Sequence, residues 1–329
     1  MNVYQPNSTP EGLCCQFDRE NRLKTDFGDR GVERRRIILV DHGKISDRLM
    51  KTSHRLFKGR TCYPEPEAIA QIIRFLQQVL LPNYFTKNST EDDSAELCET
   101  IEELHGMLST QIHRAIFQKC YKEDEQSETR LLAVEKADGL IAKLPELQEM
   151  LFEDVVETYH SDPAATGYDE IILTYPGLFA LSVYRVAHVL FELSVPLLPR
   201  MMTEYAHRLT GVDLHPGATL GRGIMIDHGT GIVVGETAIV GNHVRIYQGV
   251  TLGALYFPRD DTGAMVRSTK RHPTVEDDVI LYANATVLGG ETIIGHHSVI
   301  GSNAWVTESV EPFSKVLYKT ESIVHTKQR

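Results

Sequence analysis

The stretch that decides the fold is VDLHPGATLGRGIMIDHGTGIVVGETAIVG, residues 212–241. Around it a glycine recurs at every sixth position, and the same spacing resumes after one interruption. A six-residue period matches neither an amphipathic helix nor an alternating strand. It is typical of a parallel β-helix, in which each hexapeptide forms one short side of a triangular coil. The glycines are Gly211, Gly217, Gly223, Gly229, Gly235 and Gly241, then Gly253, Gly289, Gly295 and Gly301.

Aliphatic and small residues keep the same period. Three hexapeptides would complete one coil, so residues eighteen apart should stack, with aliphatic side chains pointing into the coil. The predicted inward set is Val234, Val240, Ile246 and Leu252, continued by Leu288, Ile294 and Ile300. The predicted small set is Ala238, Val244 and Val250, continued by Thr292, Ser298 and Ala304.

Asp227 and His228 interrupt this regular pattern. His228 falls in the phase that is aliphatic at Val234 and Val240, and a regular sequence that breaks its own rule often marks function or strain. The structural alternative is a histidine at the coil surface with a satisfied hydrogen bond. Asp213 precedes His228 by fifteen residues, close to one coil, so its carboxylate could orient the ring and stabilise imidazolium. Such a pair can act as a general base.

The period is interrupted between the hexapeptides by residues 254–271, which contain Pro258, Gly263 and several charges. A solenoid tolerates such an insertion as a loop thrown out from one coil, and loops of this kind often carry function. Arg271 and His272 close the loop.

The remaining chain divides into regions of different texture. Residues 1–60 are polar without clean periodicity, and we expect a partly disordered extension. Apolar stripes at helical spacing then predict an α-helical domain. The predicted organisation is an extension at 1–60, an α-helical domain at 61–210, the β-helix at 211–310 with its loop insertion at 254–271, and a tail at 311–329.

Composition excludes several classes of protein. The formal net charge of −11 argues against a nucleic-acid binder. No apolar run is long enough for a membrane span, and the N-terminus lacks the basic and apolar regions of a secretory signal. The five cysteines show no CxxC spacing, so neither a zinc site nor a disulfide framework is predicted. We therefore expect a cytoplasmic protein.

The repeat segment quoted above, together with VRIYQGVTLGA (244–254) and KRHPTVEDDV (270–279), closely resembles the serine O-acetyltransferases of cysteine biosynthesis. The upstream stretch SDPAATGYDEIILTYPGLFALSVYRVAHVLF (161–191) resembles them too. The resemblance implies an N-terminal α-helical domain followed by a left-handed parallel β-helix. It implies transfer of an acetyl group from acetyl-CoA to the hydroxyl of L-serine, giving O-acetyl-L-serine and CoA. No metal is expected, because a thioester is already activated.

The resemblance also implies roles for individual residues. His228 resembles the general base, and Asp213 its carboxylate partner. Asp162 and Asp227 correspond to contacts of the substrate amino group, and Arg271 and His272 to contacts near its carboxylate. The implied catalytic residues are His228, Asp213 and His272; the implied substrate-binding residues are Asp162, Asp227, Arg271, His272 and Glu236; the positions expected to border CoA are Gly253, Ala254, Ala283, Gly301 and Ser302.

The resemblance further implies partners. A homo-oligomer is expected, either a trimer or a dimer of trimers, together with feedback inhibition by L-cysteine in the serine site. Many family members end in isoleucine, which docks into cysteine synthase. This chain ends in Gln328-Arg329, so a cysteine synthase complex is doubtful.

Two other functions compete with this one. A related acetyltransferase could act on homoserine or a sugar, although a sugar has no amino group for Asp162 to bind. A metal-bearing scaffold resembling a carbonic anhydrase would need three histidines converging on one metal. The available histidines are His228, His243, His272, His296 and His297.

Overall fold

The computed structural model describes residues 41–56, 63–85, 93–117, 123–257, 259–266 and 269–319. The chain divides into two compact units, Met1–Leu56 and Phe57–Arg329. In the first unit, helix α1 (His42–Leu56) occupies part of the segment for which the sequence showed no clean periodicity. The rest of the predicted extension lies outside the described residues, and so do the last ten residues of the predicted tail.

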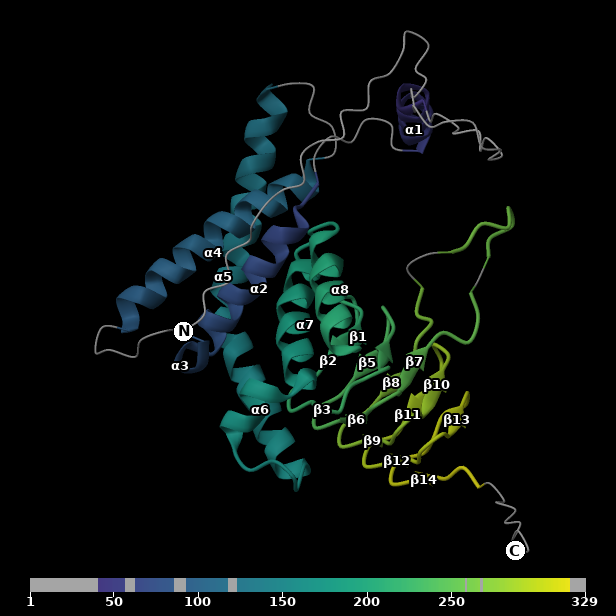
Figure 1. Ribbon diagram of the computed structural model, residues 1–329. Coiled ribbons are helices and arrows are strands. Elements are labelled where there is room, and N and C mark those ends of the chain that lie inside the picture. Colours follow the sequence, from purple (N-terminus) through teal and green to yellow (C-terminus); the bar gives the residue numbers. More distant parts are fainter. Residues whose placement is uncertain are drawn as a thin grey trace, which may run out of the picture. The chain divides into compact units, whose positions relative to one another are not determined.

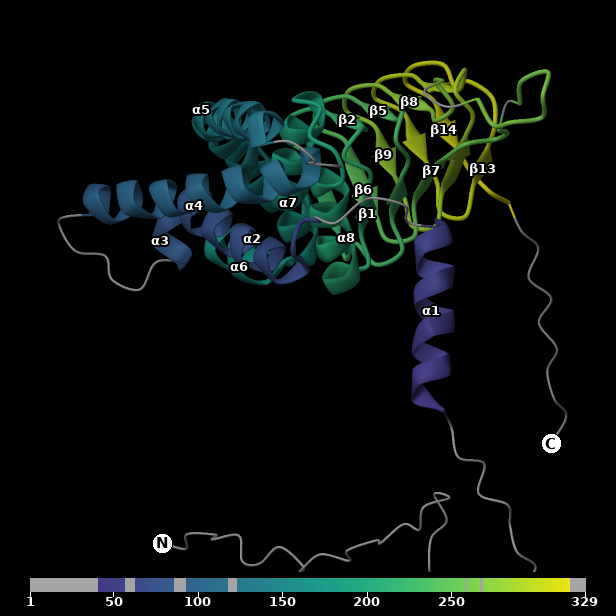
Figure 2. The same ribbon diagram turned by 90° about the horizontal axis from the view of Figure 1, so that it is seen from above.

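The second unit begins with a group of helices and continues as a β-solenoid (Figures 1 and 2). The helical stripes predicted from the sequence are the buried faces that pack together, as Ile72, Leu104 and Leu140 illustrate with no exposed surface. None of the helices in the described segments is both long and apolar enough to cross a membrane. The helices are α2 (Pro66–Leu80), α3 (Pro82–Phe85), α4 (Asp93–Ile116), α5 (Glu123–Ser161), α6 (Tyr168–Thr174), α7 (Pro176–Glu192) and α8 (Leu198–Thr210).

Helix α7 joins the two parts of this unit because it is buried on most of its circumference. It begins with a proline at its first turn, where a missing N–H costs nothing. Leu178 and Leu190 pack in the helical core, whereas Leu181 and Tyr184 pack in the core of the solenoid. Helix α8 ends at Gly211, whose φ of 74° is the left-handed conformation common after a helix. The first strand follows directly.

All strand pairs of the solenoid are parallel, as the six-residue period predicted. Sheet 1 has the order β1-β4-β7-β10-β13, sheet 2 the order β2-β5-β8-β11, and sheet 3 the order β3-β6-β9-β12-β14. The strands are β1 (Asp213–Leu214), β2 (Thr219–Leu220), β3 (Met225–Asp227), β4 (Val233–Val234), β5 (Ile239–Val240), β6 (Arg245–Tyr247), β7 (Thr251–Gly253), β8 (Thr274–Val275), β9 (Ile280–Leu281), β10 (Thr286–Leu288), β11 (Ile293–Ile294), β12 (Val299–Ile300), β13 (Trp305–Val306) and β14 (Lys315–Val316).

The chain turns at three corners in every coil, and two of them carry or adjoin predicted site residues. The histidine corner leads from sheet 3 to sheet 1 and contains residues 228–232 in the first coil. The arginine corner leads from sheet 1 to sheet 2 and contains residues 235–238 and, one coil later, 254–273. The third corner leads from sheet 2 to sheet 3, at residues 221–224 in the first coil.

The register corrects the predicted place of His228. Val233 pairs with Thr251 eighteen residues later, as expected, but Asp213 pairs with Val233 twenty residues later. The two additional residues lie in the histidine corner, between β3 and β4. The inward residues on either side are Ile226 and Val234, both buried. His228 therefore does not replace an inward aliphatic residue, because the longer corner carries it outward.

A second correction concerns Leu288. Val287, not Leu288, is the inward residue of β10 and is fully buried, whereas Leu288 is half-buried. In this coil Thr274 pairs with Ile293, nineteen residues on, so one additional residue precedes β11. The other predicted inward residues, from Val234 to Leu252 and at Ile294 and Ile300, are confirmed as core.

Candidate active site

The histidine corner presents an exposed imidazole on a strained backbone. Asp227 is the last residue of β3, and its carboxylate is mostly covered, with 16% of the side chain exposed. His228 has a φ of 56° and leaves 69% of its side chain exposed. A left-handed conformation at a non-glycine residue costs of order 1 kcal/mol and is often found where function requires it. His228 Nε2 lies 3.6 Å from Asp227 Oδ2.

Asp162 comes from the helical region to the same place. It follows the C-terminal end of α5, and its Oδ1 accepts the backbone N–H of Ala164 at 2.8 Å. Its Oδ2 accepts the hydroxyl of Tyr175 at 2.5 Å. This bond, with burial and the charges of Asp162, Glu170 and Asp227, raises the pKa of Tyr175. Three carboxylates thus act on one tyrosine hydroxyl.

Tyr247 adds a fourth side chain to this group. It pairs with Asp227 in the register of β3 and β6. Burial raises the pKa of Tyr247, and so do the negative charges of Asp227 and Asp162. The structure therefore brings together Asp162 and Asp227, as the sequence predicted, and adds Tyr175 and Tyr247. Two carboxylates in one neighbourhood favour a bound cation.

The arginine corner holds a second group of charged residues. The guanidinium of Arg271 donates a short hydrogen bond to Glu236, which lowers the pKa of Glu236. Thr237 joins the two segments: its Oγ1 accepts the backbone N–H groups of Arg271 at 3.0 Å and His272 at 3.1 Å. Lys270 Nζ donates to the carbonyl of Thr237 at 2.9 Å. Each of these side chains is thus held by its neighbours before any ligand binds.

His272 is neutral in this environment. Burial, followed by the positive charge of Arg271, lowers its pKa to about 4. Its Nδ1 accepts the backbone N–H of Thr237 at 3.1 Å, so the neutral ring carries its proton on Nε2. The ring lies on Gly235, where an added Cβ would come within 2.1 Å of Nε2. His272 can therefore donate a hydrogen bond but does not offer a second positive charge.

Asp213 does not contact His228. Its Oδ1 accepts a hydrogen bond from Nη1 of Arg200, in helix α8, at 2.9 Å. Glu204, His207 and Asp213 offer ligand atoms within 4.8 Å of one another, a spacing that could hold a metal ion. However, Arg200 is paired with both Glu204 and Asp213 and supplies the positive charge there. The carboxylate of Asp213 is thus paired with Arg200, and its predicted pairing with His228 stays a prediction.

The two groups of residues occupy different corners of one coil. Strand β4 (Val233–Val234) lies between them, and one side of a coil is about six extended residues, or roughly 20 Å. Across the parts of the chain that the structure describes, no hydrogen bond or ion pair connects Asp162 or Asp227 with Arg271 or His272. Within one chain the predicted substrate contacts therefore form two half-sites.

The comparisons with known proteins decide the family. No protein-family model matches the chain. A curated protein of Synechococcus elongatus, "Serine acetyltransferase, plasmid", is 42% identical over 256 residues, which cover 75% of this chain and 80% of the relative. This chain belongs to the serine acetyltransferases. The predicted enzyme class, an acyltransferase acting on serine, is thereby confirmed.

Solved structures of this family agree with the fold. Serine acetyltransferase 1 of Entamoeba histolytica, in complex with L-cysteine, is 34% identical with a TM-score of 0.66, covering 84% of this chain and 97% of that one. Isoform 3 of the same organism, in complex with cysteine, is 29% identical with a TM-score of 0.66, covering 87% and 95%. The prediction of a left-handed β-helix, the fold of serine acetyltransferases, is thereby confirmed.

The positions expected to border CoA in a serine acetyltransferase fall on the same two corners. Gly253 ends strand β7 and Ala254 begins the insertion of the arginine corner, which contributes Tyr256, Lys270 and Arg271 to the lining of a cavity of about 320 Å³. Ala283, Gly301 and Ser302 lie at the histidine corner in later coils. There the rings of Tyr247 and Tyr282 stack with centroids 5.1 Å apart.

Sequence reasoning missed Tyr175, Tyr247 and Arg200. Tyr175 lies in the quoted segment 161–191, but nothing in its spacing distinguishes it from a packing residue. Tyr247 could not have been found by an eighteen-residue spacing, because the first coil has twenty residues and pairs Asp227 with Tyr247 instead of Arg245. Arg200 sits on α8 with no motif around it, so only the packing of that helix against β1 reveals it.

Proposed function

We propose that His228 removes the proton of the L-serine hydroxyl as its oxygen attacks the acetyl thioester of acetyl-CoA. A carbon–oxygen bond forms and the carbon–sulfur bond breaks. The departing thiolate then takes from the imidazolium the proton that came from the serine hydroxyl. The products are O-acetyl-L-serine and CoA. The observation that supports this role is the exposed ring of His228, held outward by the longer corner with a carboxylate 3.6 Å away.

General-base help of this kind is worth about 10²–10⁴-fold. Within the chain the carboxylate nearest the ring is that of Asp227. The predicted support from Asp213 rests on the family resemblance, since Arg200 binds that carboxylate.

Serine carries two charges, and the two half-sites match them. Asp162 and Asp227, with Tyr175, would bind the ammonium group. Arg271 would pair with the carboxylate, and the Nε2–H of neutral His272 would donate to it. Glu236 holds Arg271 in place.

The separation of the half-sites supports a homo-oligomer, a trimer or a dimer of trimers. A second copy, with its arginine corner against this chain's histidine corner, would bring both halves around one serine. The five positions expected to border CoA are divided between the same corners. Acetyl-CoA is therefore expected to bind between copies, close to the serine hydroxyl.

L-cysteine is expected to compete with serine, because it carries the same ammonium and carboxylate groups and is bound in two Entamoeba histolytica relatives. Initial rates at several serine concentrations, with and without cysteine, test this. The doubtful cysteine synthase complex and the cytoplasmic location remain predictions; residues 320–329 lie outside the described chain.

The experiment that tests the proposed mechanism is CoA release with L-serine as acceptor, for the wild type and His228→Asn. Asparagine tolerates the left-handed conformation but cannot take the proton, so we expect a loss of at least about 100-fold with little change in thermal stability. His297→Asn is the matched control, since His297 has a φ of 58° and a carboxylate at 3.6 Å but lies at the third corner.

Near wild-type turnover in His228→Asn would refute the general-base role. Release of CoA with homoserine or a sugar, but not with serine, would instead show that the acceptor is another hydroxyl compound, as in the competing acetyltransferase hypothesis.

A further inference from the structure

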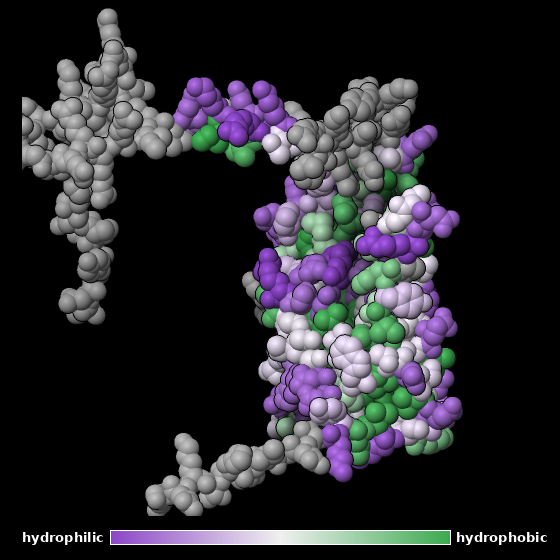
Figure 3. Space-filling view, turned by 90° about the vertical axis from the view of Figure 1, so that its right-hand side faces the viewer, coloured by the Kyte–Doolittle hydropathy of each residue, from purple (hydrophilic) through white to green (hydrophobic). Residues whose placement is uncertain are grey.

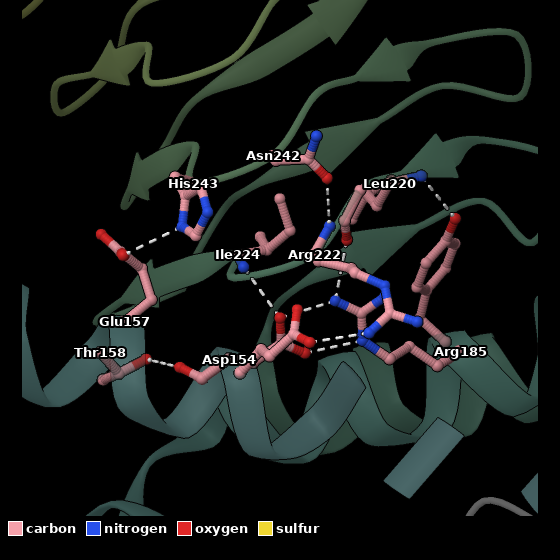
Figure 4. A network of polar contacts seen from close by, with 12 residues as sticks. Asp154, Glu157, Thr158, Arg185, Leu220, Arg222, Ile224, Asn242 and His243 are labelled. Atoms are coloured by element: carbon pink, nitrogen blue, oxygen red, sulfur yellow. Dashed lines mark hydrogen bonds and ion pairs between the residues drawn. The ribbon is translucent and has the colours of Figure 1, made fainter. Parts of the chain in front are cut away.

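A buried ion pair fastens helix α5 to the solenoid, two turns before Asp162. Asp154 has no exposed surface and Arg185, in α7, has 3%. Nε of Arg185 donates to Oδ2 of Asp154, and Nη2 to Oδ1, both at 2.6 Å. Figure 4 shows this pair between the helices and the strands of the first coils. Its two parallel bonds fix direction as well as distance.

The same pair also binds the backbone of the third corner. The N–H of Ile224 donates to Oδ1 of Asp154 at 2.8 Å, and Nη2 of Arg185 donates to the carbonyl of Gly221 at 3.0 Å (Figure 4). This backbone leads directly into β3, whose last residue is Asp227. One buried pair therefore connects α5, α7 and the strand that carries Asp227.

A second contact holds the last turn of α5 against the next coil. Glu157 accepts Nε of Arg245 at 2.9 Å, and its other oxygen lies 3.3 Å from Nδ1 of His243. The hydroxyl of Ser161 donates to Glu157 at 2.8 Å. Arg245 belongs to β6, the strand that ends at Tyr247. The end of α5 is thus bonded to the two coils whose strands β3 and β6 end at Asp227 and Tyr247.

We propose that Asp154 and Arg185 are positioning residues that set the separation of Asp162 and Asp227, and with it the fit of the acceptor's ammonium group. The proposal rests on the proposed function, which assigns that ammonium group to these two carboxylates. A helix is stiff over the eight residues from Asp154 to Asp162, about 12 Å. A displacement at the ion pair therefore carries through to Asp162.

Apolar packing alone would not hold this separation as well, because the contacts of α5 and α7 are non-directional and tolerate small slides. Buried ion pairs contribute little net stability compared with apolar residues of the same size, but they can define a unique arrangement. Replacing both members therefore separates positioning from stability.

The test is the double variant Asp154→Leu with Arg185→Met, assayed in the full-length oligomer. It keeps apolar bulk at the interface and removes all four directional bonds. We expect the serine KM and the cysteine Ki to rise together by roughly 10-fold or more, with the acetyl-CoA KM unchanged. Arg185→Lys, which retains the charge pair with Asp154 but not the two parallel bonds, should lose less.

Arg222→Ala is the matched control. It removes an exposed ion pair, Arg222 with Glu153 at 2.7 Å, between the same helix and the same corner. Because this pair does not reach the strand backbone through a buried group, we expect unchanged kinetics. If the double variant does not fold, the comparison of Arg185→Lys with Arg222→Ala carries the test.

Unchanged serine KM in a folded double variant, or an equal rise of the serine and acetyl-CoA KM values, would overturn the proposal. Asp162→Asn and Asp227→Asn separate this failure from failure of the proposed function. If those two variants leave the serine KM unchanged, the ammonium assignment itself is wrong.

Discussion

The two corners that flank sheet 1 differ in how exposed their polar side chains are and in how many neighbours bind them. At the histidine corner the ring of His228 is 69% exposed and has a single carboxylate neighbour at 3.6 Å. At the arginine corner Glu236, Arg271 and His272 are held by one another and by Thr237. A base must keep a lone pair free for its substrate, whereas groups that recognise charge gain from being fixed in advance.

The backbone follows the same division. The histidine corner contains three residues with positive φ, at His228, Gly229 and Gly231, and two residues more than the next coil needs. The arginine corner keeps the regular spacing at residues 235–238, and Gly235 there makes room for the ring of His272. Strain accompanies the outward, exposed position of His228, whereas close packing holds the groups of the arginine corner in place.

The largest effect should come from mixing chains with defects in different corners. His228→Asn and Arg271→Ala are each expected to lose about 100-fold or more in kcat/KM, from loss of the base and of the carboxylate partner. If one site takes its corners from two copies, randomly mixed oligomers should recover roughly a quarter of wild-type activity. Co-expression with two affinity tags, followed by CoA-release assays, measures this.

The matched control mixes His228→Asn with Asp227→Asn, whose defects share one corner. No arrangement of those chains contains an intact histidine corner, so activity should stay low. If the first mixture also stays low although the tags show mixed oligomers, each site is built within one chain and the division into half-sites is wrong.

A smaller effect is expected from Gly235→Ala, which disturbs the packed corner without removing a polar group. Its Cβ would meet the ring of His272 at 2.1 Å, so the ring must shift. Overpacking of this kind costs about 1–3 kcal/mol in the free energy of unfolding, and we expect the serine KM to rise as well. Urea unfolding and steady-state kinetics check both effects.

Gly106→Ala provides the control, since an added Cβ in the middle of α4 meets nothing within 4 Å. That substitution should be neutral or stabilising, by up to about 1 kcal/mol from helix propensity. Equal behaviour of the two alanine variants would mean that His272 is not confined by Gly235.

The smallest effect is a pH dependence of stability from His272. Its pKa in the folded chain is about 4, below the ordinary value of 6.5. Between these values the unfolded chain binds a proton that the folded chain does not, so stability falls as pH falls through this window.

His272→Gln removes this titration, so its urea midpoint should fall less than that of the wild type between pH 7 and pH 4.5, at equal protein concentration. Parallel decreases in the two proteins would show that other groups account for the acid sensitivity.

Much of the fold could be read from local spacing. The six-residue period was sufficient for a parallel solenoid, because every coil repeats the same demand for an inward aliphatic residue and a turn. Counting residues could not show where a coil lengthens, so His228 and Leu288 were assigned to the wrong phase. Additional residues are accommodated at corners, and only strand pairing reveals which corner takes them.

The features of the candidate site likewise fall into those that the sequence could identify and those that it could not. Asp227 and His228 could be selected from the sequence because they interrupt a regular repeat, whereas Arg271 and His272 were selected through the resemblance to a known family. The neutral state of His272, the bond from Tyr175 to Asp162 and the capture of Asp213 by Arg200 could not. Each depends on burial or on a contact between two separate elements of the fold.

The sequence by itself therefore determined the β-helix, the helical region before it and the residue types that could carry acyl transfer. The reason is that backbone periodicity and side-chain chemistry are local properties. Only the tertiary structure decided that these residues lie at two separate corners of the coil, and that Asp154 and Arg185 connect helix α5 to the strand of Asp227. Those relations depend on how helices pack against coils, which no local pattern encodes.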